Sequence, residues 1–450
     1  MKTRKLLCVT VMGSMLGLAS SVALAKADAA DVARLGQDLT PFGSEKAGNA
    51  SGTIPAWTGG LTQAPAGFIP GKGYVDPYAS DKPVYTITAA NMAQYADQLT
   101  PGYKAMLQKF ASYKMIVYPT HRPVGLPATE YEQIKKEAGT VALADNGAGM
   151  LNYDKTSVPF PVPKTAQELL YNHSLRYRSG GYHYFPTEMV VKPGGNFTVI
   201  HRDVTLAMAS ALGNPEPNRL YYYLSKVTGP DSVAGQQSLV YEPIDQVKEP
   251  RLAWQYNPGQ RRVLRAPELA YDTVDGLSDG LRTLDMYDMF SGAPDRYDWQ
   301  LLGKKEMIVP YDTYKLADRS LQYSDIVKPD HLNQDLIRYE THRVWVVQAT
   351  LKPGARHIYA KRIFYIDEDS WAILAADLFD GRGELWRMQE AHGLQRYDVL
   401  SSIAISDVAY DLQARSYVVN GLENQEKQSS FGVHFTLQDF SPAALRRAGN

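Results

Sequence analysis

Apolar and polar side chains alternate with a period of two residues along most of the chain after Gly181. The alternation is clearest over residues 336–351, 357–367 and 372–378, and a further short run follows at 384–389. Turn-forming residues such as Lys352-Pro353-Gly354 separate these runs. Because successive side chains of a strand point to opposite faces of a sheet, the pattern predicts an antiparallel meander.

Shorter alternating runs precede the meander, at residues 182–192, 197–208, 219–227, 239–244, 251–255 and 261–265. The last two flank Asn257-Pro258-Gly259, which is typical of a hairpin turn. In residues 337–349 one face is apolar and the other is mixed, which fits a sheet with a dry concave face. The chain is therefore expected to be mainly β, of the α+β class, with a large curved antiparallel sheet.

The segment before Gly181 has a different texture. Residues 31–88 are dense in Gly, Pro, Asn and Ser, which indicates an arm with little regular structure that becomes ordered on contact. Thr100-Pro101 predicts the start of a helix, a second helix is expected at 129–138, and Thr165 with Glu168 forms a capping box that opens a third. We expect these helices and the arm, residues 26–163, to pack on a half-barrel domain of residues 164–450.

The first residues predict export. Lys2, Arg4 and Lys5 form a basic start, residues 6–22 are apolar or small, and Ala23-Leu24-Ala25 suits signal-peptidase cleavage. Residues 1–25 are therefore expected to be a removed signal peptide, with cleavage after Ala30 as the second choice. The only cysteine, Cys8, lies in this leader, so the mature chain is expected to contain neither a disulfide nor a thiolate site.

Charge narrows the choice of partners. The chain has 47 Lys and Arg against 48 Asp and Glu, and loss of the leader removes three basic residues and no acidic one. A mature chain with this small acidic excess offers no basic field for nucleic acid. After the leader no stretch of about 20 apolar residues follows, so no membrane-spanning helix is expected.

Tyrosine is unusually frequent, with 30 Tyr against 12 Phe and 6 Trp. Tyrosine suits half-buried positions, where the ring is dry and the hydroxyl is wet. Two interpretations stay open at this point. The sheet has one solvated face, or it forms an amphipathic cavity or groove.

No motif in the sequence carries recognisable catalytic or metal chemistry. A phosphate-binding Gly-rich loop, Gly-x-Ser-x-Gly and His-Glu-x-x-His are all absent from the sequence. The nine histidines show no tight zinc-like spacing, and His342 with His357 across a hairpin is the best remaining pair. We therefore predict no catalytic residues, no metal and no cofactor.

One polar cluster allows two interpretations. Asp288, Asp295, Arg296 and Asp298 lie close together in the sequence. Paired carboxylates of this kind do acid–base work in glycoside hydrolysis. The favoured interpretation is a loop tied by Asp–Arg pairing and Asx turns, which aromatic residues at 297 and 299 anchor to the sheet.

Several short sequence segments resemble those of a known protein family. Residues 38–49 and 52–60, then 257–263, 290–299 and 339–351 with 357–362, resemble domain of unknown function family 1329 over nearly the whole mature chain. That family looks like a distant relative of the lipoprotein-carrier superfamily typified by the periplasmic Lol carrier. The resemblance implies an unclosed antiparallel β-barrel with helices over one side, covering an apolar cavity. It also implies an inner-membrane efflux-type transporter and an outer-membrane protein as partners, and no catalytic residue.

The resulting expectation is a periplasmic carrier for a lipid or another hydrophobic molecule. Exposing an acyl chain of ~14 carbons to water costs on the order of 11 kcal/mol, at about 0.8 kcal/mol per CH₂. A protein cavity that keeps the chain dry removes most of this cost. The alternatives are an adaptor that uses the arm to bridge a transporter and an outer-membrane partner, and a hydrolase using Asp carboxylates. Association with the outer membrane is also left open. The residues expected to line the cavity are Tyr339, Trp345, Val347, Phe364, Ile366 and Ile373.

Overall fold

The fold is described from a computed structural model, which describes residues 27–145, 147–266 and 271–449. The predicted signal peptide, residues 1–25, lies outside these described residues, as does Cys8 within it. None of the helices in the described ranges is long and apolar enough to cross a membrane.

One large sheet of seventeen strands dominates the structure, and a separate hairpin, β3 (Ala142–Leu143) and β4 (Met150–Leu151), stands beside it. The second half of the chain forms a continuous antiparallel meander in the sheet. Its strands are β12 (Tyr297–Pro310), β13 (Tyr339–Leu351), β14 (Lys361–Asp367), β15 (Ile373–Phe379), β16 (Leu385–Arg396), β17 (Ser401–Asp411) and β18 (Ser416–Asn420).

An earlier meander joins this one where β18 pairs with β6. Its strands are β5 (Gly181–Tyr184), β6 (Thr187–Val191), β7 (Phe197–Met208), β8 (Arg219–Gly229), β9 (Gln237–Pro243), β10 (Leu252–Asn257) and β11 (Arg262–Arg265). The predicted run 182–192 is split into β5 and β6, which both pair with β7, because Pro186 at the break cannot donate a ladder hydrogen bond. The predicted hairpin turn at residues 257–259 is confirmed, since β10 pairs with β11 around it.

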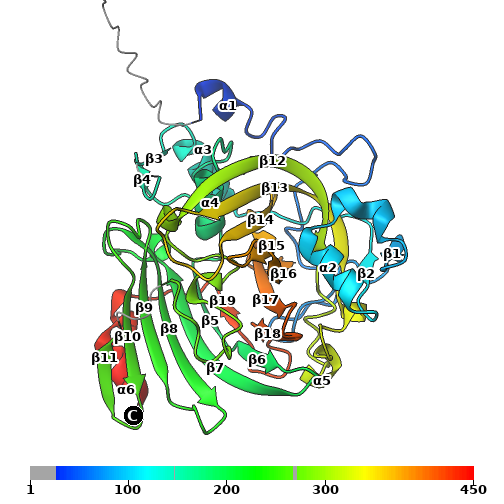
Figure 1. Cartoon of the computed structure of the whole chain (residues 1–450). Helices are drawn as coiled ribbons and strands as arrows, with labels where there is room; N and C mark the ends of the chain where they lie inside the picture. The colour runs from blue at the N-terminus through cyan, green and yellow to red at the C-terminus, as the bar shows by residue number, and fades with distance from the viewer. Residues whose placement is uncertain (1–26, 146, 267–270, 450) are drawn as a thin grey trace, which may run out of the picture.

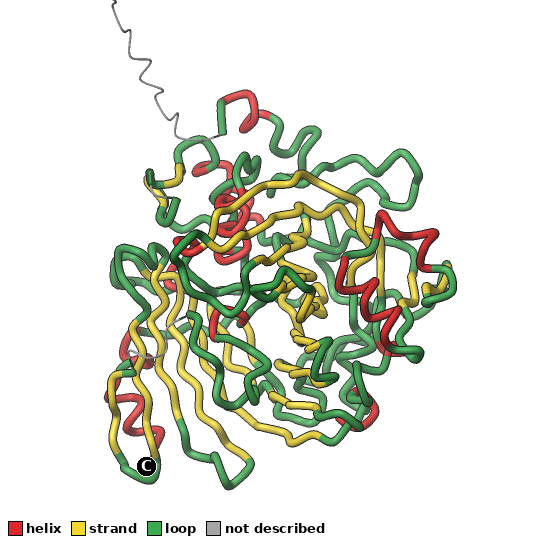
Figure 2. Tube along the Cα trace, viewed as in Figure 1, coloured by secondary structure: helices red, strands yellow, loops and turns green. Residues whose placement is uncertain are grey.

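The sheet bends around residues 271–296, which precede β12, and does not close (Figures 1 and 2). Among the described residues β11 pairs only with β10, and β12 only with β13, so these two strands remain edges. Three short strands complete the sheet: β1 (Tyr85–Ile87) and β2 (Met115–Val117), with β2 parallel to the start of β13, and β19 (Ser430–Phe431) beside β5. The prediction of a mainly β, curved and unclosed antiparallel sheet is confirmed.

The three predicted helices begin within one residue of their expected starts, and in its described part the structure adds three α-helices that were not predicted. Thr100 caps α2 (Pro101–Lys109) by accepting from the Tyr103 amide, and Thr165 with Glu168 forms the predicted capping box of α4 (Ala166–Leu175). The other helices are α1 (Ala29–Ala33), α3 (Ala128–Glu137), α5 (Tyr323–Ile326) and α6 (Pro442–Gly449).

Helices cover parts of both faces of the sheet. The core cluster of α2 contains Val344 and Val346 of β13, whereas the cluster of α4 contains Val347, which points to the opposite face. β15 is buried at every one of its 7 positions, so both faces of this central strand are covered. The helices α2 and α4 thus pack against opposite faces of β13.

The Gly/Pro-rich arm is docked on the sheet. The Phe42 ring is completely buried, and its carbonyl oxygen accepts a hydrogen bond of 3.1 Å from Trp371 Nε1. Lys304 of β12 binds Glu45 at 2.7 Å, and Arg122 binds Asp369 at 2.7 Å and the carbonyl of Glu45. Phe42 and Glu45 thus anchor the arm to the folded core.

Candidate functional site

A cavity of about 580 Å³ lies inside the bend of the sheet. Its walls are β5, the inner face of β7 to β10, the segment 274–291 before β12, and β17 with the ends of β16 and β18. Pockets that hold small molecules typically have volumes of about 300–1,000 Å³. The interior is therefore large enough for a ligand of ordinary size.

Strand alternation decides which side chains reach this cavity. On β8, Tyr221, Tyr223 and Ser225 line it, whereas Tyr222 points outward and packs with Leu445 of α6. Apolar and polar groups share the lining. The apolar and aromatic residues include Tyr182, Leu206, Val227, Val240, Ile403 and Phe431, and the charged ones include Arg178, Arg202, Arg251, Arg396, Asp275, Asp288, Asp407 and Glu423.

The segment that covers the cavity is held by a buried arginine. Arg282 is fully buried and contacts Glu188 of β6 at 2.7 Å, Asp275 at 3.1 Å and Asp407 of β17 at 3.6 Å. Its guanidinium lies 3.9 Å from the centre of the Tyr287 ring, and the Tyr287 hydroxyl donates to Asp275 at 2.9 Å. These contacts lock the covering segment to two strands of the sheet.

Asp288 is held by two arginines. Arg176 donates to its Oδ2 at 3.0 Å and to its Oδ1, and Arg178 also donates to its Oδ2. Burial opposes ionisation of Asp288, but Arg176 and Arg178 outweigh it and keep the pKa below its usual range. Burial and then Arg176 lower the pKa of neighbouring His173 to about 3, so this histidine is neutral.

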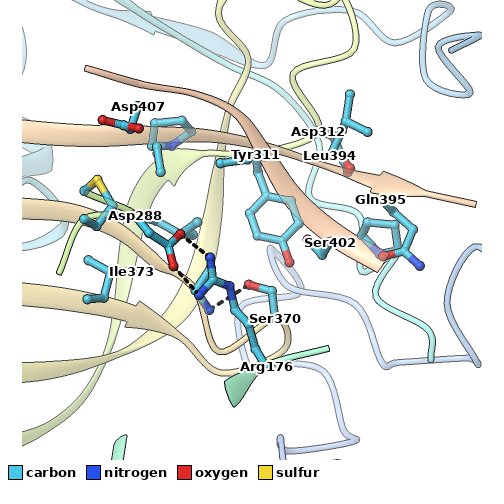
Figure 3. A pocket seen from close by; sticks show the side chains of 18 residues that line it. Arg176, Asp288, Tyr311, Asp312, Ser370, Ile373, Leu394, Gln395, Ser402 and Asp407 are labelled. Carbon is cyan, nitrogen blue, oxygen red and sulfur yellow. Dashed lines mark hydrogen bonds and ion pairs between the residues drawn. The ribbon is translucent and has the colours of Figure 1, made fainter. Parts of the chain in front are cut away.

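Figure 3 shows a second, small pocket of about 30 Å³ that adjoins the large one and shares Asp288 and Asp407 with it. Asp312 lines the small pocket, and neither of its carboxyl oxygens has a hydrogen-bond partner. Burial, then Glu340, raises the pKa of Asp312, so its neutral form is favoured. Burial also raises the pKa of Asp407 to about 6.

The six residues expected to line a cavity lie elsewhere. Val347, Phe364 and Ile366 pack with Phe42 and other side chains in a filled cluster. Ile373 belongs to the same cluster and also lines the small pocket. Trp345 is half-buried, with the Lys304 ammonium group 4.7 Å from the centre of its ring. Tyr339 lies in the core around α2. None of the six lines the large cavity, because the arm and α4 pack against the Trp345 side of this region and α2 packs against Tyr339.

The acidic loop does not assemble a catalytic pair. Asp288 is drawn inward by Arg176 and Arg178, whereas Asp295 and Asp298 are exposed. Arg296 binds Asp272 at 2.7 Å. Asp–Arg pairing does tie this loop, as the favoured interpretation has it, but with partners that are distant in sequence.

The histidines considered as a metal pair lie apart. His342 is 3.1 Å from Glu340, and His357 is 3.2 Å from Asp285. Over residues 27–145, 147–266 and 271–449, no group of three or more His, Cys, Asp or Glu is arranged to hold a metal ion.

The sequence did contain one signal for the cavity. Residues 221–223 are three consecutive tyrosines, and strand alternation sends two of them inward. The abundance of tyrosine had left an amphipathic cavity open as an interpretation, and this lining matches it. The inward arginines give no such signal, because their partners, such as Asp288 for Arg178, are remote in the chain.

A family model described as "Protein of unknown function (DUF1329)" matches residues 86–446. The chain belongs to the DUF1329 family. A relative from Pseudomonas aeruginosa, "Uncharacterized protein PA3922", is 47% identical over 456 residues and covers 100% of both chains. The predicted family membership is confirmed.

Three solved structures resemble this DUF1329 chain at low similarity. A putative outer membrane lipoprotein-sorting protein domain from Vibrio parahaemolyticus has 16% identity and a TM-score of 0.43, covering 63% of this chain and 97% of its own. A DUF1329 family protein from Desulfovibrio piger has 14% identity and a TM-score of 0.41, covering 60% and 92%. The LolA superfamily protein NE2245 from Nitrosomonas europaea has 12% identity and a TM-score of 0.37, covering 63% and 100%.

Proposed function

We propose that this DUF1329 protein is a binding protein of the bacterial periplasm that carries a hydrophobic molecule with a polar end in the 580 Å³ cavity. The cavity is the observation that carries the proposal. Valine, leucine and tyrosine side chains supply an apolar surface, and each CH₂ buried there contributes about 0.8 kcal/mol. The arginine and acidic side chains in the same lining can bind the polar end of the ligand.

The compartment follows from the leader. The basic start, the apolar stretch and Ala23-Leu24-Ala25 favour export, and a carrier for an apolar molecule is useful in the aqueous space between two membranes. The transporter and outer-membrane partners implied by the family resemblance would be the systems that load and unload such a carrier. We propose no catalytic role, since the candidate acids Asp288, Asp295 and Asp298 do not converge on one cleft.

The test is to fill the cavity and measure binding of an uncharged probe. Ser238 of β9 lines the cavity and is half-buried, so Ser238→Trp places an indole in the interior. The matched control is Thr228→Trp, at an exposed position of the neighbouring strand β8. We expect Ser238→Trp to weaken binding of Nile red at least tenfold, whereas Thr228→Trp leaves it unchanged.

Native mass spectrometry of the mildly purified wild-type protein provides the second readout. We expect masses of co-purified apolar molecules that decrease in Ser238→Trp and persist in Thr228→Trp. If Nile red binds both variants as it binds the wild-type protein, the cavity is not the binding site and the proposal is wrong.

A further inference from the structure

One arginine in the cavity wall differs from the other three. Arg178 binds Asp288, Arg202 binds Glu188 at 3.2 Å, and Arg251 binds Glu242 at 2.5 Å. Arg396 forms no ion pair with any carboxylate of the described residues, although its exposed fraction is only 6%. Its Nε, also buried, has no hydrogen-bond partner.

Two aromatic rings hold the Arg396 guanidinium in place. Its central carbon lies 4.1 Å from the ring centre of Phe431, which lines the cavity, and 5.2 Å from that of Tyr74. Such cation–π contacts stabilise a guanidinium without binding its N–H donors. A side-chain hydrogen bond also links Arg396 to Tyr74, whereas its buried Nε donor has no partner and remains available for an anion.

Glu423 interacts with Arg396 electrostatically, but among the described residues the two form no direct ion pair. Glu423 lines the same cavity, but its Oε1 accepts from the Ser429 hydroxyl at 2.7 Å and from the Phe185 amide at 3.3 Å. Burial raises the pKa of Glu423, and the positive charges of Arg396 and Arg319 oppose this rise without an ion pair to either. At this end of the cavity the Arg396 guanidinium therefore has no carboxylate of the described residues bound directly to it.

A second cation lies close by. A pocket of about 50 Å³ shares Arg396, Glu423 and Phe431 with the large cavity and is also lined by Arg319. The Arg319 guanidinium donates to the backbone carbonyls of Glu423 and Glu426, with no carboxylate of the described residues bound to it. Arg319 therefore adds a second positive charge to the small pocket that Arg396 also lines.

A buried charge without a counter-ion is costly, and an anionic ligand removes that cost on binding. We propose that Arg396 binds the carboxylate or phosphate head group of a single-chain anionic amphiphile, with its apolar chain along Leu206, Val227 and Val240 of β7 to β9. The inference rests on the proposed function, because it assigns the ligand class of the same cavity. Planar guanidinium donors match both carboxylate and phosphate oxygens.

The test compares ligands that differ only in the head group. Displacement of Nile red is measured with dodecanoate, dodecyl phosphate and dodecanol on the wild-type protein, Arg396→Gln and Arg396→Lys. Arg262→Gln, at an exposed arginine of β11, is the matched control. A charge-assisted hydrogen bond contributes about 1.5–3 kcal/mol, so the anions should bind at least tenfold more tightly than dodecanol.

We expect Arg396→Gln to reduce this preference to about onefold without changing dodecanol affinity, Arg396→Lys to keep part of it, and Arg262→Gln to keep all of it. A merely structural Arg396 would change affinity for all three ligands alike. If Arg396→Gln does not fold, the wild-type protein and Arg396→Lys still decide the preference.

The contrary outcomes separate the two proposals. Equal wild-type affinity for dodecanol and the anions would overturn the inference and leave the proposed function intact. Failure of all three ligands to displace Nile red would also overturn the inference, whereas the proposed function fails only if Ser238→Trp leaves Nile red binding unchanged. Arg396-dependent binding of inorganic phosphate as tight as that of dodecyl phosphate would assign the site to a free anion and overturn the amphiphile.

Discussion

Phe42 offers a quantitative test of whether the N-terminal arm is part of the folded core. The ring has no exposed surface, and it packs edge-on against Trp57 at 5.5 Å between ring centres and roughly parallel to Tyr131 at 6.3 Å. Phe→Ala substitutions in filled cores cost about 3–5 kcal/mol, since the lost transfer energy is joined by a cavity. The hydrogen bond from Trp371 Nε1 uses the backbone carbonyl of residue 42, so the substitution does not remove its acceptor.

We therefore expect Phe42→Ala to lower the free energy of unfolding by about 4 kcal/mol. With an m-value of about 3 kcal/mol per M, the midpoint of urea unfolding falls by roughly 1.3 M. The assay is equilibrium urea unfolding followed by tryptophan fluorescence and far-UV circular dichroism.

Ile69→Ala is the matched control, because Ile69 lies in the same Gly/Pro-rich arm but is 59% exposed. It should change the free energy of unfolding by no more than about 0.5 kcal/mol. A Phe42→Ala variant as stable as Ile69→Ala would refute the assignment of the arm to the core. The same reasoning bears on the adaptor hypothesis, because deletion of residues 31–60 would remove core contacts together with any docking surface.

Two further predictions concern stability. Burial raises the pKa of Asp407 to about 6, above its unfolded value of 3.8. The free energy of unfolding that depends on this group is therefore highest below about pH 4 and falls as pH rises through 6, because the unfolded chain ionises first. Asp407→Asn should flatten this dependence in urea unfolding between pH 4 and 8 and raise stability at pH 8 by at most about 3 kcal/mol; an unchanged pH profile would contradict it. Thr165→Ala should cost about 1 kcal/mol by removing the cap of α4, while Thr228→Ala, at an exposed strand position, should cost less than half as much. Equal thermal shifts for the two threonine variants would count against the capping box.

Local chemistry alone determined much of the secondary structure. The predicted run 197–208 has the same bounds as β7, and the turn 257–259 joins two paired strands. Both follow from alternation and turn residues, which act over a few positions. The cap at Thr100 and the box at Thr165 needed only residues within one helical turn. The family could also be read from short strings, and its membership is confirmed.

The site was decided by tertiary structure. Both faces of residues 219–227 are rich in apolar and aromatic side chains, so period-two alternation does not say which face meets the interior. Only the curvature of the sheet sends Tyr221 and Tyr223 inward and Tyr222 toward α6. The Trp345 face looked equally suitable in sequence, but the arm and α4 fill the space next to it.

Ion pairing follows the same division. Whether an arginine in this cavity is compensated depends on carboxylates far away in the chain, as Arg176 and Asp288 are 112 residues apart. No local pattern distinguishes the paired Arg178 from the unpaired Arg396. A sequence records which side chains are available, whereas packing determines which of them meet, because burial and Coulomb interactions depend on distance in space rather than along the chain.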